Sequence, residues 1–316
     1  MASPIALIVL NWNGREMTAD CIRSVLAMRG REYELIVVDN GSRDGSVEYF
    51  KKEFPQCTVL PQVRNLGFPG GCNVGIREAL ERGAEYVIPL NNDTIVDRGF
   101  LEELIRVAEQ DPQVAIVSPK IYFYDLPDRF WWAGGKFSLW TGVPMHVGRK
   151  EQDEGQFDRE RPLDWATGCA MLIRASALRR VGLFDEKFFL NAEDLDLSVR
   201  MRRAGYQIWY APKARLWHKE GVDRRNNGVN HINAFSGARN LLWIMQKHAS
   251  VLQWATFWPN FLVRYAGFYV ARSILHRDLR SACAILRGIA AFFMMPANLE
   301  PPPLAAVARE SVEKTD

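Results

Sequence analysis

The chain begins with a regular alternation of apolar runs and amphipathic segments. Continuous apolar runs of strand length cover residues 4–13, 33–39, 57–62, 84–90 and 114–123. Between them, apolar residues recur at helical spacing in residues 17–28, 46–54, 72–83 and 99–112, with Thr18 as a candidate cap of the first helix. Such repeated strand–helix units predict an α/β fold with a doubly wound, mostly parallel sheet flanked by helices.

The second half of the chain is patterned less regularly. Residues 125–165 mix aromatic, glycine and charged residues without a helical period, which predicts loops and short strands. Residues 166–182 then predict a strand followed by a helix, and residues 193–218 a helix followed by a strand. We therefore expect one domain over residues 1–235, a C-terminal helical region over residues 236–300 and a loose, proline-rich tail over residues 301–316.

Composition excludes several classes of protein. The 316 residues carry a net charge of only +3, which gives no electrostatic case for binding nucleic acid. Five cysteines, none in CxxC spacing, indicate neither a disulfide framework nor a zinc site and fit a reducing cytosol. The N-terminus lacks the basic region of a signal peptide. The most apolar later stretch, residues 249–271, contains Pro259 and Arg264 and is a poor candidate for a membrane span.

Polar side chains follow three of the predicted strands where each strand ends. They are Asn11, Asn13, Asp39, Asn40, Asn91, Asn92 and Asp93. Ligands of open α/β sheets bind outside the carboxyl ends of the strands, so we expect these side chains to line one ligand crevice. The alternative is that asparagine and aspartate simply favour turns. Three strand ends with the same chemistry favour a site.

A glycine-rich stretch, "RNLGFPGGCNVGI" at residues 64–76, precedes the third predicted helix. It reads as a loop that leads into a helix, where backbone N–H groups are able to approach a phosphate. The stretch matches neither GxGxxG nor GxxxxGK[ST], so it indicates neither a dinucleotide fold nor a P-loop. On its own it is a weak signal, and a tight connection is the alternative.

The segment "NAEDLDLSVRMRRAGY", residues 191–206, predicts a helix that starts with two acids. Asp196 and Arg200 form an i,i+4 pair, and Gly205 is a natural stop. Glu193 and Asp194 fall in the first turn, where the helix dipole favours a charged carboxylate. A general base needs a charged carboxylate with access to its proton. Simple stabilisation of the helix start explains the two acids equally well.

Six segments in this order resemble the motifs of inverting glycosyltransferases of family 2, which have the GT-A fold. They are "LNWNG", "VVDNGSRDGS", "RNLGFPGGCNVG", "LNNDT", "DWATGCAMLIR" and "LFDEKFFLNAEDLDLSVRMRRAGY". More narrowly, they resemble the rhamnosyltransferase-like branch that builds bacterial cell-surface polysaccharide. The resemblance covers residues 5 to about 240. It implies a catalytic domain over residues 1–235, with a nucleotide-binding half at 1–120 and an acceptor-binding half at 121–235.

The resemblance also assigns roles in donor binding. Asn11 and Asp39 would contact the nucleobase and ribose, and Arg64 and Asn73 the nucleotide or its diphosphate. The remaining donor-binding candidates are Asn13, Asn65, Gly70, Asn91 and Asn92. "NND" at residues 91–93 stands where the family has a metal-binding DxD motif. Asp93 keeps the position of the metal ligand for Mg²⁺ or Mn²⁺, while the two asparagines offer only neutral oxygens.

The same resemblance implies the catalytic and remaining metal-binding residues. Asp194 matches the catalytic base, beside Glu193, and would take the proton of the acceptor hydroxyl. His218 matches a histidine that some relatives use as a further metal ligand; a structural histidine is the alternative. Trp131, Trp132 and Trp165 are candidate acceptor contacts, because flat rings pack well against sugars. They would be equally ordinary as core residues.

The implied activity is transfer of a sugar, expected to be L-rhamnose from dTDP-rhamnose, to a saccharide or polyprenyl-linked saccharide. A non-catalytic nucleotide-sugar-binding protein and a nucleotidyltransferase are the alternatives; the latter would need a basic, glycine-rich N-terminal loop that "LNWNGREMT" does not provide. Aromatic and basic residues crowd residues 241–295, which predicts contact with a membrane surface. The alternative is burial against the catalytic domain or in a homodimer. We expect a cytoplasmic protein, peripheral on the inner face of the cell membrane if those helices contact lipid.

Overall fold

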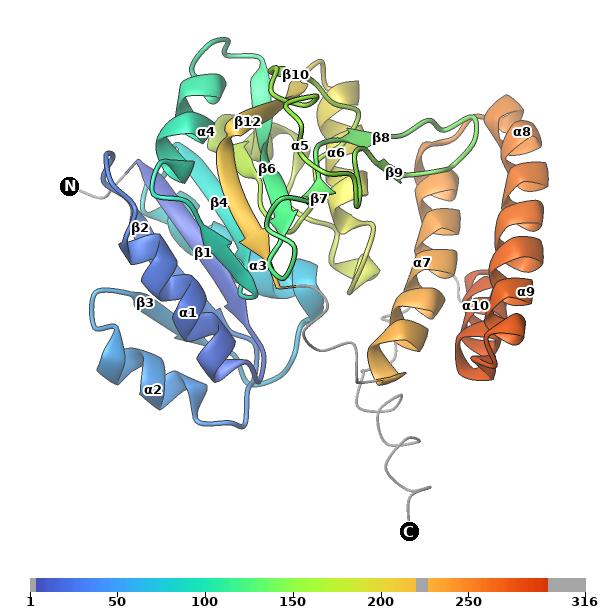
Figure 1. Cartoon of the computed structure of the whole chain (residues 1–316), viewed down its shortest axis with the longest axis horizontal. Helices are drawn as coiled ribbons and strands as arrows, with labels where there is room; N and C mark the ends of the chain where they lie inside the picture. Colours follow the sequence, from blue (N-terminus) through green and yellow to red (C-terminus); the bar gives the residue numbers. More distant parts are fainter. Residues whose placement is uncertain (1–3, 220–226, 295–316) are drawn as a thin grey trace. The chain divides into compact units, whose positions relative to one another are not determined.

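The computed structural model describes residues 4–219 and 227–294, with the side chains of residues 227–230 and of Ala266 left aside (Figure 1). The chain divides into two compact units. The first, the α/β unit, comprises Met1–Phe137, Pro144–Glu186 and Glu193–Glu220, and the second, the helical unit, comprises Ser138–Val143, Lys187–Ala192 and Gly221–Asp316. The helical unit therefore includes two short segments from the part of the chain that otherwise forms the α/β unit. The predicted tail at residues 301–316 lies outside the described residues.

The α/β unit is built on one mixed sheet with the strand order β10-β12-β6-β11-β4-β1-β2-β3. Six strands run in one direction: β1 (Ile5–Asn11), β2 (Glu34–Asp39), β3 (Thr58–Pro61), β4 (Tyr86–Asn91), β6 (Val114–Phe123) and β12 (Gln207–His218). Four short strands run against them: β5 (Thr94–Val96), β7 (Phe130–Trp132), β10 (Arg161–Pro162) and β11 (Leu172–Arg174). The predicted fold class, a mostly parallel α/β sheet flanked by helices, is confirmed.

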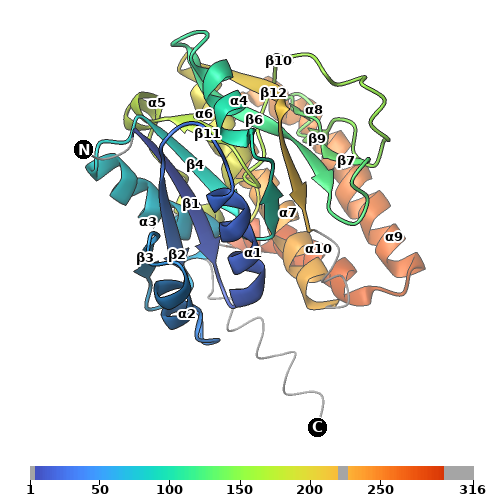
Figure 2. The same cartoon turned by 60° about the vertical axis from the view of Figure 1, so that its left-hand side comes forward.

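Helices cover both faces of this sheet: α1 lies in front of it in Figure 1 and α3 behind it, and Figure 2 shows the same arrangement from the side. The helices of the α/β unit are α1 (Arg15–Leu26), α2 (Ser46–Glu53), α3 (Gly67–Glu81), α4 (Phe100–Ala108), α5 (Ala175–Val181) and α6 (Glu193–Arg203). Strands β8 (Gly135–Lys136) and β9 (Met145–His146) form a separate small ribbon. Because both faces are covered, the central strands are buried on both sides; Leu7, Ile8 and Val9 of β1 have no exposed surface.

Helix α3 begins five residues earlier than the sequence indicated. It starts at Gly67 rather than Cys72, so the glycine-rich stretch is largely helix and not a loop. A Cβ atom on Gly71 would lie 2.3 Å from Leu10 Cδ1, and one on Gly75 would lie 2.5 Å from Ile8 Cγ2. The glycines therefore let α3 pack against β1 more closely than any side chain would allow. The alternative named for this stretch, a tight structural connection instead of phosphate binding, therefore accounts for Gly71 and Gly75.

The helical unit consists of α7 (Asn227–His248), α8 (Val251–Phe261), a π-helical segment (Leu262–Tyr269), α9 (Val270–Leu275) and α10 (Leu279–Met294). Ser250 caps α8 in a reciprocal capping box with Gln253. The backbone of α10 approaches α7 closely, since a Cβ atom on Gly288 would lie 2.4 Å from the Phe235 carbonyl oxygen. Among the helices in the described ranges, none is both long and apolar enough to cross a bilayer. None of the five cysteines forms a disulfide, and Cys283 on α10 is exposed.

The close approach of α3 predicts that Gly75→Ala destabilises the protein. The added methyl group would meet Ile8 and Val38, both fully buried, and overpacking of this kind costs about 1–3 kcal/mol. Gly237→Ala in α7 is the control, because a Cβ atom there meets nothing within 4 Å and alanine favours helix. Urea unfolding measures both. Equal stability of the two variants would contradict the packing role of Gly75.

Candidate active site

The carboxyl ends of three parallel strands lie side by side in the α/β unit. In the register of the sheet, Asn11 at the end of β1 pairs with Asp39 at the end of β2, and Leu10 pairs with Asn91 at the end of β4. Asn11 and Asp39 are buried, whereas Asn91 is half-buried. Three polar strand ends thus meet at one edge of the sheet, where open α/β sheets bind their ligands.

A hydrogen-bonded network connects these strand ends. Asn11 Nδ2 donates to Asp39 Oδ2 at 2.7 Å and to Ser42 Oγ at 3.1 Å. Thr18 Oγ1 donates to Asn11 Oδ1 at 2.7 Å, and Asn92 Nδ2 donates to Thr18 Oγ1 at 2.8 Å. Thr18 and Ser42 were not recognised as site residues. Thr18 lies inside α1 rather than at its cap, and its signal was a polar residue on the buried face of an amphipathic helix.

The donor-binding candidates beside this network differ in how they are held. Asn65 Oδ1 accepts hydrogen bonds from Asn40 Nδ2 at 3.0 Å and from the Gly67 backbone N–H at 2.8 Å, at the start of α3. Asn13 has a left-handed backbone, and its Oδ1 accepts from the Arg43 backbone N–H. Arg64 is exposed and makes no hydrogen bond or ion pair with another described residue. Of this group, Arg64 is the side chain that remains available to an anion.

Asn73 and Gly70 are buried within α3. Asn73 Nδ2 donates to the Phe184 carbonyl and to Glu186 Oε1, both at 2.9 Å, and its Oδ1 accepts from the Phe184 backbone N–H at 3.1 Å. Its amide is therefore used to hold residues 184–186 against α3. Direct contact of Asn73 with a diphosphate, as the sequence motif implied, would require it to give up these bonds.

Asp93 and His218 lie next to each other where β12 ends. The antiparallel pairing of β5 with β12 brings them together, and Asp93 Oδ1 is 3.0 Å from His218 Nε2. Both atoms are buried, and neither makes a hydrogen bond of good geometry. Trp131 packs edge-on against the His218 ring, with 4.6 Å between ring centroids. In residues 4–219 and 227–294, no group of three or more histidine, cysteine or acidic side chains could hold a metal ion.

Glu193 and Asp194 occupy the first turn of α6, as the sequence indicated. Asp194 Oδ2 accepts from the Gly168 backbone N–H at 2.8 Å, and Oδ1 from the Leu195 N–H at 2.7 Å. Burial raises the pKa of Asp194 to about 6, against the two backbone N–H groups that lower it, although part of the side chain remains accessible to solvent. Burial and the neighbouring Asp194 charge raise the pKa of Glu193 well above its usual value. Near neutral pH, Asp194 is thus mostly charged, whereas burial disfavours the charged form of Glu193.

The segment Thr167–Ala170 links the two acidic positions. Its Gly168 N–H holds Asp194, and its Cys169 carbonyl accepts from the Asn91 backbone N–H at 2.9 Å. Asn91 is two residues before Asp93. A single stretch of backbone therefore connects the carboxylate at the start of α6 with the end of β4, both within the α/β unit. The "DWATGCAMLIR" motif was recognised from the sequence, but its role as this link was not.

The three tryptophans proposed as acceptor contacts are core residues in this structure. Trp132 has no exposed surface, and Trp131 and Trp165 are 7% and 5% exposed. Trp132 Nε1 donates to Ser118 Oγ, and Trp165 Nε1 donates to the Lys136 carbonyl. Trp132 presents no face to a sugar. The alternative considered from the sequence, a packing role, agrees with this burial. Trp12, which follows Asn11, is 49% exposed and was not singled out.

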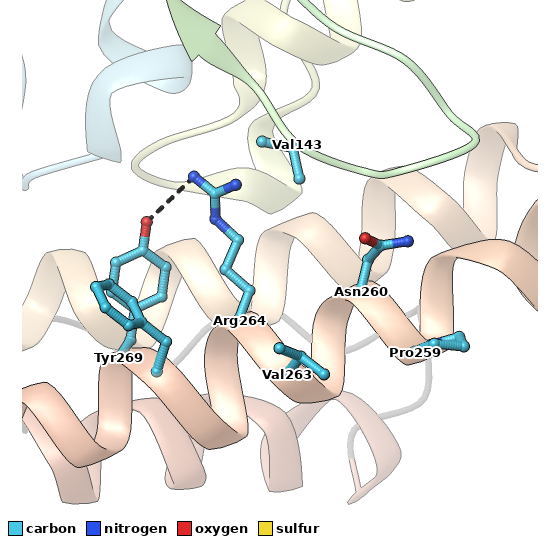
Figure 3. A pocket seen from close by; sticks show the side chains of 7 residues that line it. Val143, Pro259, Asn260, Val263, Arg264 and Tyr269 are labelled. Atoms are coloured by element: carbon cyan, nitrogen blue, oxygen red, sulfur yellow. Dashed lines mark hydrogen bonds between the residues drawn. The ribbon is translucent and has the colours of Figure 1, made fainter.

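A cavity of about 600 Å³ lies in the helical unit and involves none of the predicted site residues. Its walls are Val143, Pro259, Asn260, Val263, Arg264, Phe268 and Tyr269 (Figure 3). Arg264 reaches toward Tyr269, and its Nη2 lies 3.4 Å from the hydroxyl oxygen. This cavity combines apolar walls with one exposed cation.

The sheet and its polar carboxyl edge define an α/β protein of the kind that binds ligands outside the carboxyl ends of its strands. Residues 6–182 match the family model described as glycosyl transferase family 2, which covers more than half of the chain. The chain therefore belongs to glycosyltransferase family 2, whose members move a sugar from a nucleotide-activated donor. It is a glycosyltransferase.

Two curated relatives illustrate the breadth of the match. The N-acetylglucosaminyl-diphospho-decaprenol L-rhamnosyltransferase of Mycobacterium tuberculosis is 26% identical over 284 residues, which cover 82% of this chain and 90% of that protein. The low-salt glycan biosynthesis hexosyltransferase Agl10 of Haloferax volcanii is 24% identical over 237 residues, which cover 71% of this chain and 70% of that protein.

Two solved structures share the fold at low sequence identity. The mannosyltransferase PcManGT from Pyrobaculum calidifontis, in complex with GDP-Man and Mn²⁺, has a TM-score of 0.56 at 16% identity, over 99% of this chain and 81% of its own. GalNAc-T7 with UDP, GalNAc and Mn²⁺ has a TM-score of 0.58 at 16% identity, over 84% of this chain and 57% of its own. Both similarities concern the fold.

Proposed function

We propose that this protein is an inverting, metal-assisted glycosyltransferase in which Asp194 is the general base. The observation that carries the proposal is the state of Asp194. It is a partly accessible carboxylate whose pKa, raised to about 6 by burial, leaves it charged at neutral pH yet basic enough to accept a proton. The Gly168 N–H holds its orientation.

The neighbouring carboxyl supports inversion. Retention through a covalent intermediate needs a second, charged carboxylate as nucleophile. Glu193 is 5% exposed, and burial and the neighbouring Asp194 disfavour its charged form, which makes it a poor nucleophile. In a single displacement, the oxygen of the acceptor hydroxyl forms the new bond to the anomeric carbon and its proton passes to Asp194. The bond from that carbon to the diphosphate oxygen breaks, and the nucleoside diphosphate leaves with the electron pair.

Asp93 and His218 are the residues that would hold a divalent metal ion. Asp93 Oδ1 and His218 Nε2 lie 3.0 Å apart, so one divalent ion would be within reach of both atoms. Both atoms are buried without a well-formed hydrogen bond, as expected of atoms that serve a ligand. When bound, Mg²⁺ or Mn²⁺ would take its remaining oxygens from the diphosphate and stabilise the leaving group.

The donor would lie along the strand ends. The Asn11–Asp39–Ser42 network is held rigidly and would contact the nucleoside, while exposed Arg64 would meet the diphosphate. The mycobacterial relative is named for L-rhamnose transfer to a diphospho-decaprenol-linked sugar. We extend that chemistry to this chain: dTDP-rhamnose as donor and a polyprenyl-diphosphate-linked saccharide as acceptor, in cell-surface polysaccharide synthesis.

A lipid-linked acceptor would require the enzyme to contact a membrane, and the helical unit exposes side chains suited to such contact. Many large apolar side chains of residues 251–294 are exposed: Val251, Leu252, Leu262, Val263, Phe268, Ile274, Leu275, Leu279, Leu286, Phe293 and Met294. Five exposed arginines lie among them, at positions 264, 272, 277, 280 and 287, against one acid, Asp278. Exposed apolar residues interspersed with cations suit an anionic lipid surface, whereas the cations of two copies would repel each other.

Asp194→Asn should abolish transfer and leave donor binding nearly unchanged. Loss of a general base costs roughly 10²–10⁴ in rate. In the wild-type protein, kcat/KM should fall about tenfold per pH unit as the pH drops below about 6, because protonated Asp194 cannot accept a proton. Asp128→Asn, an exposed acid on a loop, is the control. An active Asp194→Asn enzyme would exclude this residue as the base, and donor binding without any transfer by wild type would favour a non-catalytic sugar-nucleotide-binding protein.

Asp93→Ala should weaken binding of the nucleoside diphosphate and remove most of its dependence on metal. We expect a loss of about 10- to 100-fold in affinity with Mn²⁺ and little change with EDTA. Calorimetric titration of dTDP into both proteins, with and without metal, measures this directly and needs no acceptor. If the metal dependence of the variant equalled that of the wild type, Asp93 would not be a ligand.

The exposed basic and apolar residues of the helical unit should bind anionic vesicles and release them at high salt. Arg272→Glu combined with Arg280→Glu should prevent flotation with phosphatidylglycerol vesicles, since it reverses two exposed charges. Lys51→Glu with Lys52→Glu on α2 changes the net charge equally and serves as the control. A wild-type protein that does not float at low salt would refute the membrane contact, and a dimer in sedimentation would point to a second copy instead.

A further inference from the structure

The four residues before α6 contain three non-glycine residues with left-handed backbone. Phe189 has φ 57°, Asn191 has φ 69° and Ala192 has φ 71°. Asparagine tolerates this region, but phenylalanine and alanine pay a steric cost there. Such conformations persist only where the surroundings determine them, and they concentrate at functional sites. The next residues in the chain are Glu193 and Asp194.

Asn240 of α7 holds this segment. It has no exposed surface, and its Nδ2 lies 3.1 Å from the Phe188 carbonyl oxygen, 2.8 Å from that of Leu190 and 2.7 Å from that of Asn191. All these residues belong to the helical unit. The two N–H groups of one buried amide are thus shared among three backbone carbonyls, each belonging to the residue directly before a left-handed one. These contacts suffice to explain the left-handed backbone within residues 189–192, without a carboxylate or a metal ion.

Arg239 fixes the direction of that amide. Its Nε donates to Asn240 Oδ1 at 2.9 Å, so the Asn240 NH₂ group must face the carbonyls. The Arg239 guanidinium is itself buried, lies 4.3 Å from the Trp243 ring centroid, and reaches the Phe188 carbonyl at 3.4 Å. Removing the Asn240 amide would therefore leave buried donors and acceptors on both sides without partners.

We propose that Asn240 is a positioning residue, which holds the left-handed segment Phe189–Ala192 and thereby sets the place and orientation of Asp194 at the start of α6. The inference rests on the proposed role of Asp194 as the base. Only two residues, Ala192 and Glu193, lie between Asn191, whose carbonyl Asn240 binds, and Asp194. A backbone that relaxes from the left-handed region rotates everything that follows, and misplacement by about 1 Å can cost 10²-fold in rate.

The first test is Asn240→Ala, assayed as dTDP release from dTDP-rhamnose with a polyprenyl-diphosphate-linked N-acetylglucosamine acceptor. We expect kcat to fall about 10- to 100-fold with the KM for the donor within about twofold. The acid limb of the pH profile should move to lower pH, because a displaced Asp194 is less buried. Hydrogen exchange of the amides of residues 187–195 should speed up. Met245→Ala on the same helix is the control: it removes a side chain that packs near Gly142 and should leave kcat and the pH profile unchanged.

Two variants of Ala192 act on the segment itself. Ala192→Gly favours the left-handed conformation by roughly tenfold in its equilibrium population. The double variant Asn240→Ala, Ala192→Gly should therefore have a kcat about fivefold above that of Asn240→Ala, and Ala192→Gly alone should have little effect. Ala192→Val makes that conformation costlier and should lower kcat without changing donor KM. If Asn240→Ala fails to fold, Ala192→Val decides.

Wild-type kcat and an unmoved pH profile in Asn240→Ala, or in Ala192→Val, would overturn the positioning role. Asp194→Asn separates this outcome from failure of the proposed function. If that variant is inactive while Asn240→Ala is fully active, only the positioning role is wrong. If Asp194→Asn is active, the assignment of the base is wrong, and accelerated exchange in residues 187–195 would then show a structural role alone for Asn240.

Discussion

The hydrogen bond between Asn11 and Asp39 is the contact around which the ligand edge of the α/β unit is organised. It joins the last residues of two neighbouring parallel strands at 2.7 Å and gives a buried carboxylate a donor. A charge in that position without donors would be costly, and the amide on β1 provides one of them beside the Ser42 backbone N–H. Thr18, Ser42 and Asn92 extend the network to α1 and to the end of β4, so three chain segments far apart in sequence share one rigid polar cluster.

Much of this architecture could be predicted from the sequence because parallel sheets leave a simple pattern. Strands buried on both faces are continuous apolar runs, and the strand-end residues follow directly from them. The first turn of α6 was equally readable, since Glu193 and Asp194 precede a helix with clear periodicity. Residue types with two common roles were harder to interpret from the sequence. The glycines of residues 67–75 suggested a phosphate loop, yet Gly71 and Gly75 serve helix packing, and Asn73 holds a neighbouring turn.

Other features depended on contacts that no local pattern reports. Asp93 and His218 are brought together by the pairing of β5 with β12, which joins segments more than a hundred residues apart. Trp132 is buried because it lies on β7 and donates a hydrogen bond to Ser118, and the residue type alone predicts neither. The left-handed residues before α6 could not be predicted, because alanine and phenylalanine adopt that backbone only when contacts with another part of the chain, here Asn240, stabilise it.

The cysteines of the protein differ in their exposure and therefore in their reactivity. Cys21 and Cys72 are buried, and burial raises the pKa of Cys21 to about 12 and that of Cys72 well above its usual value, while partial burial raises the pKa of Cys57 to about 11. Thiolates are the reactive form, so these groups react slowly with alkylating reagents. Cys283 is the exposed cysteine of the described chain, and it lies on α10. A fluorophore or spin label attached there would report on the surroundings of the helical unit without substituting a single native residue.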